Sequence, residues 1–80
     1  MPNHIREIYN TLDKKYGPGN IHNFSNLELL RAGVEFLTLT KFGIQEAFIN
    51  ASQISNELSK RGNKAREYDQ ELMEIIIEYK

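Results

Sequence analysis

Apolar residues recur at steps of three and four along almost the whole chain, and this period restricts the fold more than any other feature. In the first segment, Ile5, Ile8, Tyr9, Leu12 and Tyr16 fall on one stripe of a helix. Strand-like alternation occurs only at residues 36–40, inside a longer helical pattern. The sequence therefore predicts an all-α protein, a small four-helix bundle with helices at about residues 3–16, 25–42, 44–61 and 63–79. We expect residues 1–80 to form a single helical domain.

The predicted helix ends carry their own signals. Gly17 and Pro18 can end the first helix, since glycine adopts a left-handed cap and proline cannot continue the helix. The second helix begins at a capping box, in which the Ser25 hydroxyl and the Glu28 carboxylate each accept a backbone N–H bond. Its residues are apolar around most of the circumference, so we expect it to be the central helix.

Gly43 leaves two arrangements open for the middle of the chain. Gly43 followed by Ile44 matches a Schellman ending, in which the apolar residue after glycine folds back on the last helical turn. Against a break, no capping residue follows, and the apolar stripes on the two sides nearly line up. A continuous helix over residues 25–61 would be roughly 55 Å long at 1.5 Å per residue and would need a partner chain to cover it. We expect a break or sharp bend, with one continuous helix as the alternative.

Composition narrows the classes of function. The chain has 80 residues, 40% of them hydrophobic and 26% charged, with a net charge of −1, so it has no general attraction for nucleic acid or for anionic membranes. The absence of cysteine excludes disulfides and thiolate metal sites. There is no signal-peptide pattern at the start of the sequence and no apolar run long enough for a membrane span. We expect a soluble, cytoplasmic protein that does not bind membranes.

Catalysis has little support in the sequence. His4 and His22 are the only histidines, and neither has metal-ligand spacing to the other or to a carboxylate. The sequence contains no nucleophile elbow and no glycine-rich phosphate loop. We therefore expect no catalytic residues, no metal and no cofactor, and we interpret the protein as non-enzymatic.

The last predicted helix offers the clearest binding surface. Four glutamates fall within one narrow sector opposite the core stripe: Glu67, Glu71, Glu74 and Glu78. Beside them, Met73 and Ile77 form a second apolar ridge, away from the core stripe. An exposed ridge would mark an interface, in which Met73, Ile77 and the exposed part of Ile76 supply apolar anchors and the glutamates orient the partner. The alternative is that the first helix packs across this ridge within the same chain.

A second candidate surface is basic. Four cations lie close together at Lys60, Arg61, Lys64 and Arg66. The first two suit the negative end of the third helix, whereas the other two lie at the positive start of the last helix, where a cation is unfavourable. This tip could contact an anion or nucleic acid, although charged turns commonly face only water.

The sequence around Gly43, Phe42-Gly43-Ile44, resembles the turn of a helix-turn-helix, in which Ile49 would pack inward. The helix that would read DNA has no lysine or arginine before Lys60, so it could neutralise few phosphates.

From these features we expect a small regulatory or adaptor protein that self-associates, as a homodimer, and binds a protein partner through helix faces. The alternative is a nucleic-acid-binding protein that uses the basic tip or a helix-turn-helix at Gly43.

Overall fold

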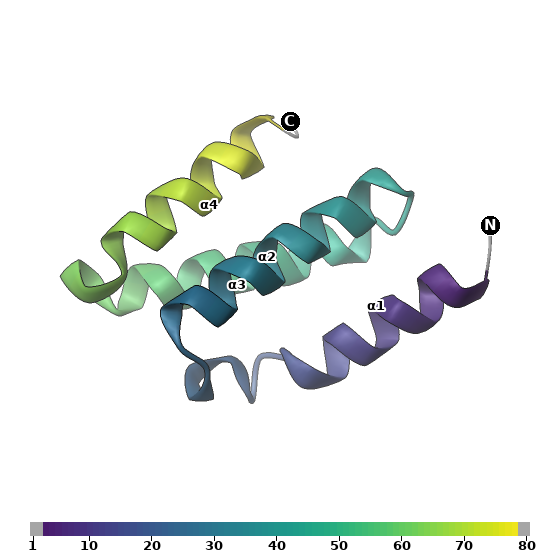
Figure 1. Ribbon diagram of the computed structural model, residues 1–80, viewed down its shortest axis with the longest axis horizontal. Helices are drawn as coiled ribbons and strands as arrows, with labels where there is room; N and C mark the ends of the chain where they lie inside the picture. Colours follow the sequence, from purple (N-terminus) through teal and green to yellow (C-terminus); the bar gives the residue numbers. More distant parts are fainter. Residues whose placement is uncertain (1–2, 79–80) are drawn as a thin grey trace.

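The computed structural model describes residues 3–78, which form four α-helices and two short 3₁₀ turns (Figure 1). The elements are α1 (Asn3–Lys15), η1 (Ile21–Asn23), α2 (Asn26–Lys41), α3 (Glu46–Lys60), η2 (Gly62–Ala65) and α4 (Arg66–Glu78). Residues 3–78 contain no strand. The predicted all-α, four-helix architecture is confirmed.

The helices α2 and α3 run antiparallel in the middle of the molecule, while α1 and α4 lie on opposite sides of this pair (Figure 1). The Cα atoms extend over 40 × 26 × 15 Å, so the molecule is flattened. Figure 1 looks down the shortest dimension, onto the broad face that carries α2, with α3 behind it. A flattened bundle of this size leaves much of its helix surface uncovered by its own chain.

The start of α2 is held by the capping box that the sequence predicts. Ser25 has extended backbone and its Oγ accepts a hydrogen bond from the Glu28 backbone N at 3.2 Å, while Glu28 Oε1 accepts from the Ser25 backbone N at 3.5 Å. The cap residue itself is not helical, so α2 begins at Asn26 rather than at residue 25.

Gly43 breaks the chain into two helices. Its φ of 107° lies in the left-handed region, and the Gly43 and Ile44 N–H groups donate to the carbonyls of Thr40 and Leu39, both at 3.0 Å. These two bonds make the Schellman ending. Ile44 folds back on α2 and is buried. It therefore belongs to the end of α2, and α3 begins at Glu46 rather than at residue 44. The continuous-helix alternative is therefore wrong.

The other helix bounds differ by a few residues from the predicted ones. The segment expected as the start of the last helix is instead part of the tighter turn η2, whose first residue, Gly62, is in the left-handed conformation. Residue 79, the predicted end of that helix, lies outside the described residues. The loop after α1 is held inward by Ile21, which is buried, and by Phe24, whose ring centroid lies 4.6 Å from that of Tyr16.

The core lies between α2, α3 and α4. Its largest fully buried side chains come from all three helices: Phe36, Leu29, Leu37, Ile54, Leu58 and Leu72. Helices α2 and α4 approach closely at Gly33, where an added Cβ would lie 2.8 Å from Leu72 Cδ1. The contribution of α1 is mainly Tyr9, whose ring meets Phe36 edge-on at 6.1 Å between centroids. Between residues 3 and 78, no helix combines the length and apolar character needed to cross a bilayer.

Candidate functional surfaces

The apolar ridge of α4 is exposed. Met73 and Ile77 keep 42% and 64% of their surface accessible. Because α1 lies on the far side of the α2/α3 pair, it does not pack across this ridge (Figure 1). Ile76, which the sequence grouped with the ridge, is only 6% exposed and belongs to the core. The exposed anchors on α4 are therefore Met73 and Ile77.

A shallow groove joins this ridge to α3. It has a volume of about 200 Å³ and is lined by Phe48, Ser52, Ser55, Asn56, Met73 and Ile76. Ser55 Oγ lies 3.1 Å from Met73 Sδ and 3.2 Å from Asp69 Oδ1, so the Met73 side chain lies along α3. The ridge on α4 and the adjoining side of α3 thus form one continuous surface.

The outer stripe of α3 carries no charge. Gln45, Ile49, Ser52 and Asn56 follow one another at helical spacing, and Ile49 is 60% exposed. Ser52 and Asn56 also line the groove beside Met73. We call the surface formed by Met73 and Ile77 of α4 with Ile49, Ser52 and Asn56 of α3 the α3/α4 face. The sequence analysis considered Ile49 only as an inward-packing residue of a helix-turn-helix, although an uncharged stripe in a chain that is 26% charged is a usable signal of an unusual surface.

The four glutamates of α4 border this face. Glu67, Glu71, Glu74 and Glu78 are all exposed. Among the described residues, ion pairs form only between Arg6 and Glu46 and between Arg61 and Glu57, so none of these four glutamates is paired there. The acidic stripe is available to a partner.

The structure divides the basic tip. Arg61 is held by its own chain: it donates to Glu57 Oε2 at 3.1 Å, to Asn26 Oδ1 at 2.8 Å, and to the carbonyls of Ile21 and His22 at 3.3 and 3.4 Å. It joins the end of α3 to the loop before α2, a role that the sequence did not indicate. Lys60, Lys64 and Arg66 remain exposed, and their side chains form no ion pair within residues 3–78.

The pair α2 and α3 has the arrangement of an αα-hairpin. The two helices return antiparallel along each other, whereas a helix-turn-helix crosses at about 90–120° (Figure 1). Ile49, which packs inward in the helix-turn-helix interpretation, is exposed instead. The geometry at Gly43 thus offers no support for a DNA-reading helix.

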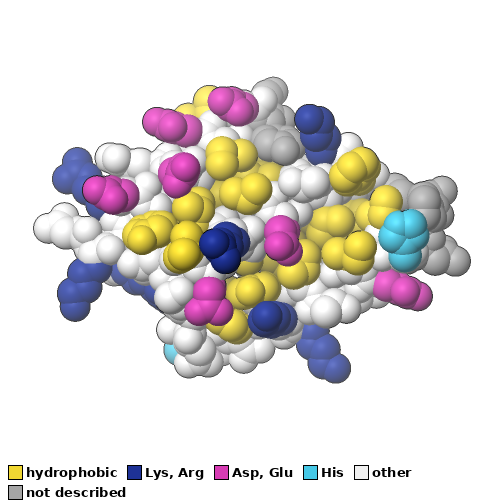
Figure 2. Space-filling view, in the orientation of Figure 1, with side chains coloured by type: hydrophobic (Ala, Val, Ile, Leu, Met, Phe, Trp, Pro, Cys, Tyr) yellow, Lys and Arg dark blue, Asp and Glu magenta, His cyan; other side chains and the backbone are white. Residues whose placement is uncertain are grey.

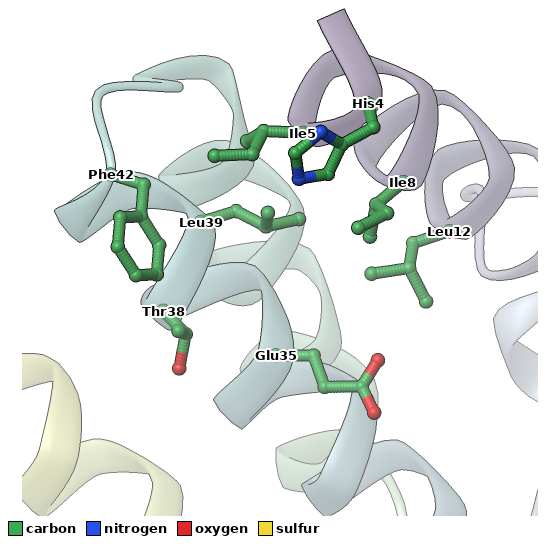
Figure 3. A pocket seen from close by; sticks show the side chains of 8 residues that line it. All are labelled: His4, Ile5, Ile8, Leu12, Glu35, Thr38, Leu39 and Phe42. Carbon is green, nitrogen blue, oxygen red and sulfur yellow. The ribbon is translucent and has the colours of Figure 1, made fainter. Parts of the chain in front are cut away.

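A groove lies between α1 and α2, with a volume of about 410 Å³ (Figure 3). Its lining is mainly apolar and comprises His4, Ile5, Ile8, Leu12, Glu35, Thr38, Leu39 and Phe42. We call it the α1/α2 groove. Ile8 and Phe42 are 48% and 58% exposed. Figure 2 shows hydrophobic side chains gathered across the face that carries this groove, with charged groups scattered between them.

Two acidic residues lie in or beside the α1/α2 groove. Glu35 lines it from α2 (Figure 3), and Glu7 lies with His4, Ile8, Thr11 and Leu12 around a shallow depression on the α1 side. The sequence analysis did not single out this groove, because Ile8 matched the core stripe of the first helix. Phe42 was the available signal, since it is a large apolar residue out of step with the stripes on either side.

Two linked side-chain hydrogen bonds hold helix α1 against α3. Tyr9 Oη donates to Asn50 Oδ1, and Asn50 Nδ2 donates to Asp13 Oδ1, each at 2.8 Å. Asn50 is 5% exposed, so this polar side chain is buried at the contact between the two helices. Burial raises the pKa of Tyr9 above its usual 10.0, and the negative charges of Asp13 and Glu46 raise it further.

An ion pair at the surface adds to this docking. Arg6 Nη1 lies 2.8 Å from Glu46 Oε2, joining α1 to the first turn of α3. The hydrogen bond from Arg6 lowers the pKa of the Glu46 carboxyl below its usual 4.5. Both groups are about half exposed, so this ion pair contributes little to stability compared with the hydrogen bonds that the buried Asn50 makes.

No cluster of three or more potential metal ligands occurs among residues 3–78. His4 lies in the α1/α2 groove and His22 in η1, at separate places. We compared the chain with models of known protein families, with curated proteins and with solved structures, and none of the three gave a match.

Proposed function

We propose that this chain is a small, non-enzymatic regulatory or adaptor protein of the cytoplasm. It binds proteins through two exposed helical surfaces: the α1/α2 groove takes a partner protein, and the α3/α4 face, bordered by its glutamates, takes a second copy. The observation that carries the proposal is the α1/α2 groove, where Ile8 and Phe42 leave about half of their apolar surface in water. An apolar hollow with a few polar groups at its edge is the usual form of a binding site.

The groove favours one kind of occupant. It runs between two helices and is lined by aliphatic and aromatic side chains, which suits the apolar face of an amphipathic helix. Glu35 in the groove and Glu7 beside it are complementary to basic residues flanking that apolar face. The partner is therefore expected to present a helix with apolar anchors and lysine or arginine at its edges.

The test is capture from an extract of the native host, followed by measurement with the purified partner. Ile8→Glu/Phe42→Asn removes the apolar edges of the groove with residues that suit a helix and a helix end. A captured protein should bind wild type and should bind this variant at least about ten-fold more weakly, since truncated anchors typically cost more than 1 kcal/mol. Unchanged affinity for every captured protein would contradict the proposal.

Ile77→Asp is the matched control. It replaces a residue of similar exposure on the α3/α4 face, away from the groove. Its capture of the partner should equal that of wild type. A loss that is the same for both variants would indicate general unfolding, and circular dichroism of each variant identifies that case.

Nucleic acid binding is the second candidate, supported by the exposure of Lys60, Lys64 and Arg66 at one end of the molecule. It has less support, because Arg61 is engaged within the chain and the net charge is −1. The material captured from the host extract decides between protein binding and nucleic acid binding. Nucleic acid that is retained by wild type and lost with Lys64→Glu/Arg66→Glu would favour this second function.

A further inference from the structure

Helix α4 carries charges that oppose its own dipole at both ends. The start of a helix is positive and its end is negative. Lys64 lies in η2 just before α4, and Arg66 is the first residue of α4. Toward its other end, within the described residues, α4 has the acidic Glu74 and Glu78 and no basic residue in its last turn. Glu67 and Asp69 in the first turn have the favourable sign. The exposed cations of this described segment are therefore confined to the start of α4, whereas the anions continue along the helix to its end, where their sign is unfavourable.

An antiparallel copy of the same helix corrects this order. Arg66, Gln70, Met73 and Ile77 lie on one side of α4, because they follow each other at steps of four, three and four. Arg66 and Ile77 are about 16 Å apart at 1.5 Å per residue. A two-fold axis midway between them brings Arg66 of each copy opposite Ile77 of the other, within reach of Glu74 and Glu78.

We propose that the α3/α4 face binds the same face of a second copy, with the two α4 helices antiparallel. Met73 and Ile77 of both copies form the apolar centre, and Lys64 and Arg66 of each copy pair with Glu74 and Glu78 of the other. This adds the antiparallel arrangement and its charge pairs to the second copy named in the proposed function, and it rests on that proposal. A two-fold interface needs a self-complementary surface, and cations at the start of α4 with glutamates at its end that are unpaired within residues 3–78 can supply one.

Such a contact would need a modest share of the molecular surface. A standard interface removes about 800 Å² from each partner, which is about 15% of the 5287 Å² accessible surface of this molecule. The uncharged stripe Gln45, Ile49, Ser52 and Asn56 of α3 lies beside the α4 ridge and adds area without burying an unpaired charge. The charged groups remain at the edge, where they set orientation.

The experiment is sedimentation velocity of the purified full chain over a range of concentrations. Wild type should show a monomer–dimer equilibrium. Ile77→Asp should weaken the dimer by about thirty-fold or more, as for a central anchor of an interface. The groove variant Ile8→Glu/Phe42→Asn should keep the wild-type dimer.

Charge reversal tests the antiparallel order. Lys64→Glu/Arg66→Glu should weaken the dimer by about ten-fold, and adding Glu74→Lys/Glu78→Lys should restore it to within about three-fold of wild type. Each reversal gives α4 a charge that suits its dipole, so the helix should remain folded, which circular dichroism checks.

Each outcome decides a separate point. A monomer at every concentration would overturn this inference but leave the α1/α2 groove to its own capture experiment. A dimer that is insensitive to Ile77→Asp would show that another face pairs. Restoration that fails in the four-site variant would overturn the antiparallel arrangement. A DNA duplex that binds wild type and is lost with Lys64→Glu/Arg66→Glu, without self-association, would replace the second copy by nucleic acid.

Discussion

Arg61 is the residue whose role departs most from its sequence context. It stands in a run of cations, yet its side chain is about four-fifths buried and its guanidinium contacts α3, the first residue of α2 and the loop that precedes it. A planar group with several donors can serve such divergent acceptors, which lysine cannot do. Its neighbour Lys60 has the same charge and faces water.

Arg61→Ala should therefore destabilise the fold by about 1–3 kcal/mol, because Asn26, Glu57 and two carbonyls lose a charged donor. Lys60→Ala should change the free energy of unfolding by less than about 0.5 kcal/mol. Urea denaturation of both variants measures the difference. Equal effects of the two substitutions would show that Arg61 is only a surface cation.

The helix α1 depends on polar contacts more than the other helices do. Its main core residue, Tyr9, donates to Asn50, so the docking of α1 includes a buried hydroxyl. The raised pKa of Tyr9 means that the folded state favours the protonated form. The corresponding stability is full below the usual pKa of 10.0 and is lost as the pH rises through the higher folded value.

Tyr9→Phe should cost about 1–2 kcal/mol at neutral pH, because the buried Asn50 Oδ1 loses its donor. Above pH 10 the gap between wild type and variant should narrow, since the phenylalanine does not titrate. Denaturation at neutral pH and at increasing alkaline pH measures both effects. A constant difference over this range would mean that ionisation of Tyr9 does not contribute.

The turn between α2 and α3 depends on one backbone angle. Gly43→Ala should lower stability by about 1–3 kcal/mol, because a φ of 107° is strained for any residue with a side chain. Gly19→Ala is the matched control: its φ is not in the left-handed region, and an added Cβ would meet no atom within 4 Å. Thermal unfolding compares them. A similar small effect at both glycines would contradict the assigned role of the turn.

At the scale of the whole molecule, the sequence predicted the four helices and the central place of α2, because apolar period, caps and glycines all act locally. The capping box at Ser25 and the exposed pair Met73 and Ile77 also follow from helical phase. The burial of Asn50 and Arg61 did not follow, because each depends on acceptors and donors more than 30 residues away.

The sequence did not predict the α1/α2 groove, for a related reason. A helical pattern shows which residues are apolar, but how far a stripe is covered depends on the position of the neighbouring helix. Ile8 lies on a regular stripe and is nevertheless half exposed, because α1 meets α2 along only part of its apolar side. Predictions of surface from sequence are thus strongest for α4, whose ridge falls outside its core stripe altogether.

The close approach of α2 and α4 at Gly33 links one buried position to the exposed surface of α4. Leu72 fits against this glycine where a single methyl group would collide, so residue 33 sets the spacing between α2 and α4. A side chain at residue 33 would force the Leu72 side chain to rearrange or α4 to move away from α2. If α4 moves, its acidic stripe and its apolar ridge change position together, although no surface residue has been replaced.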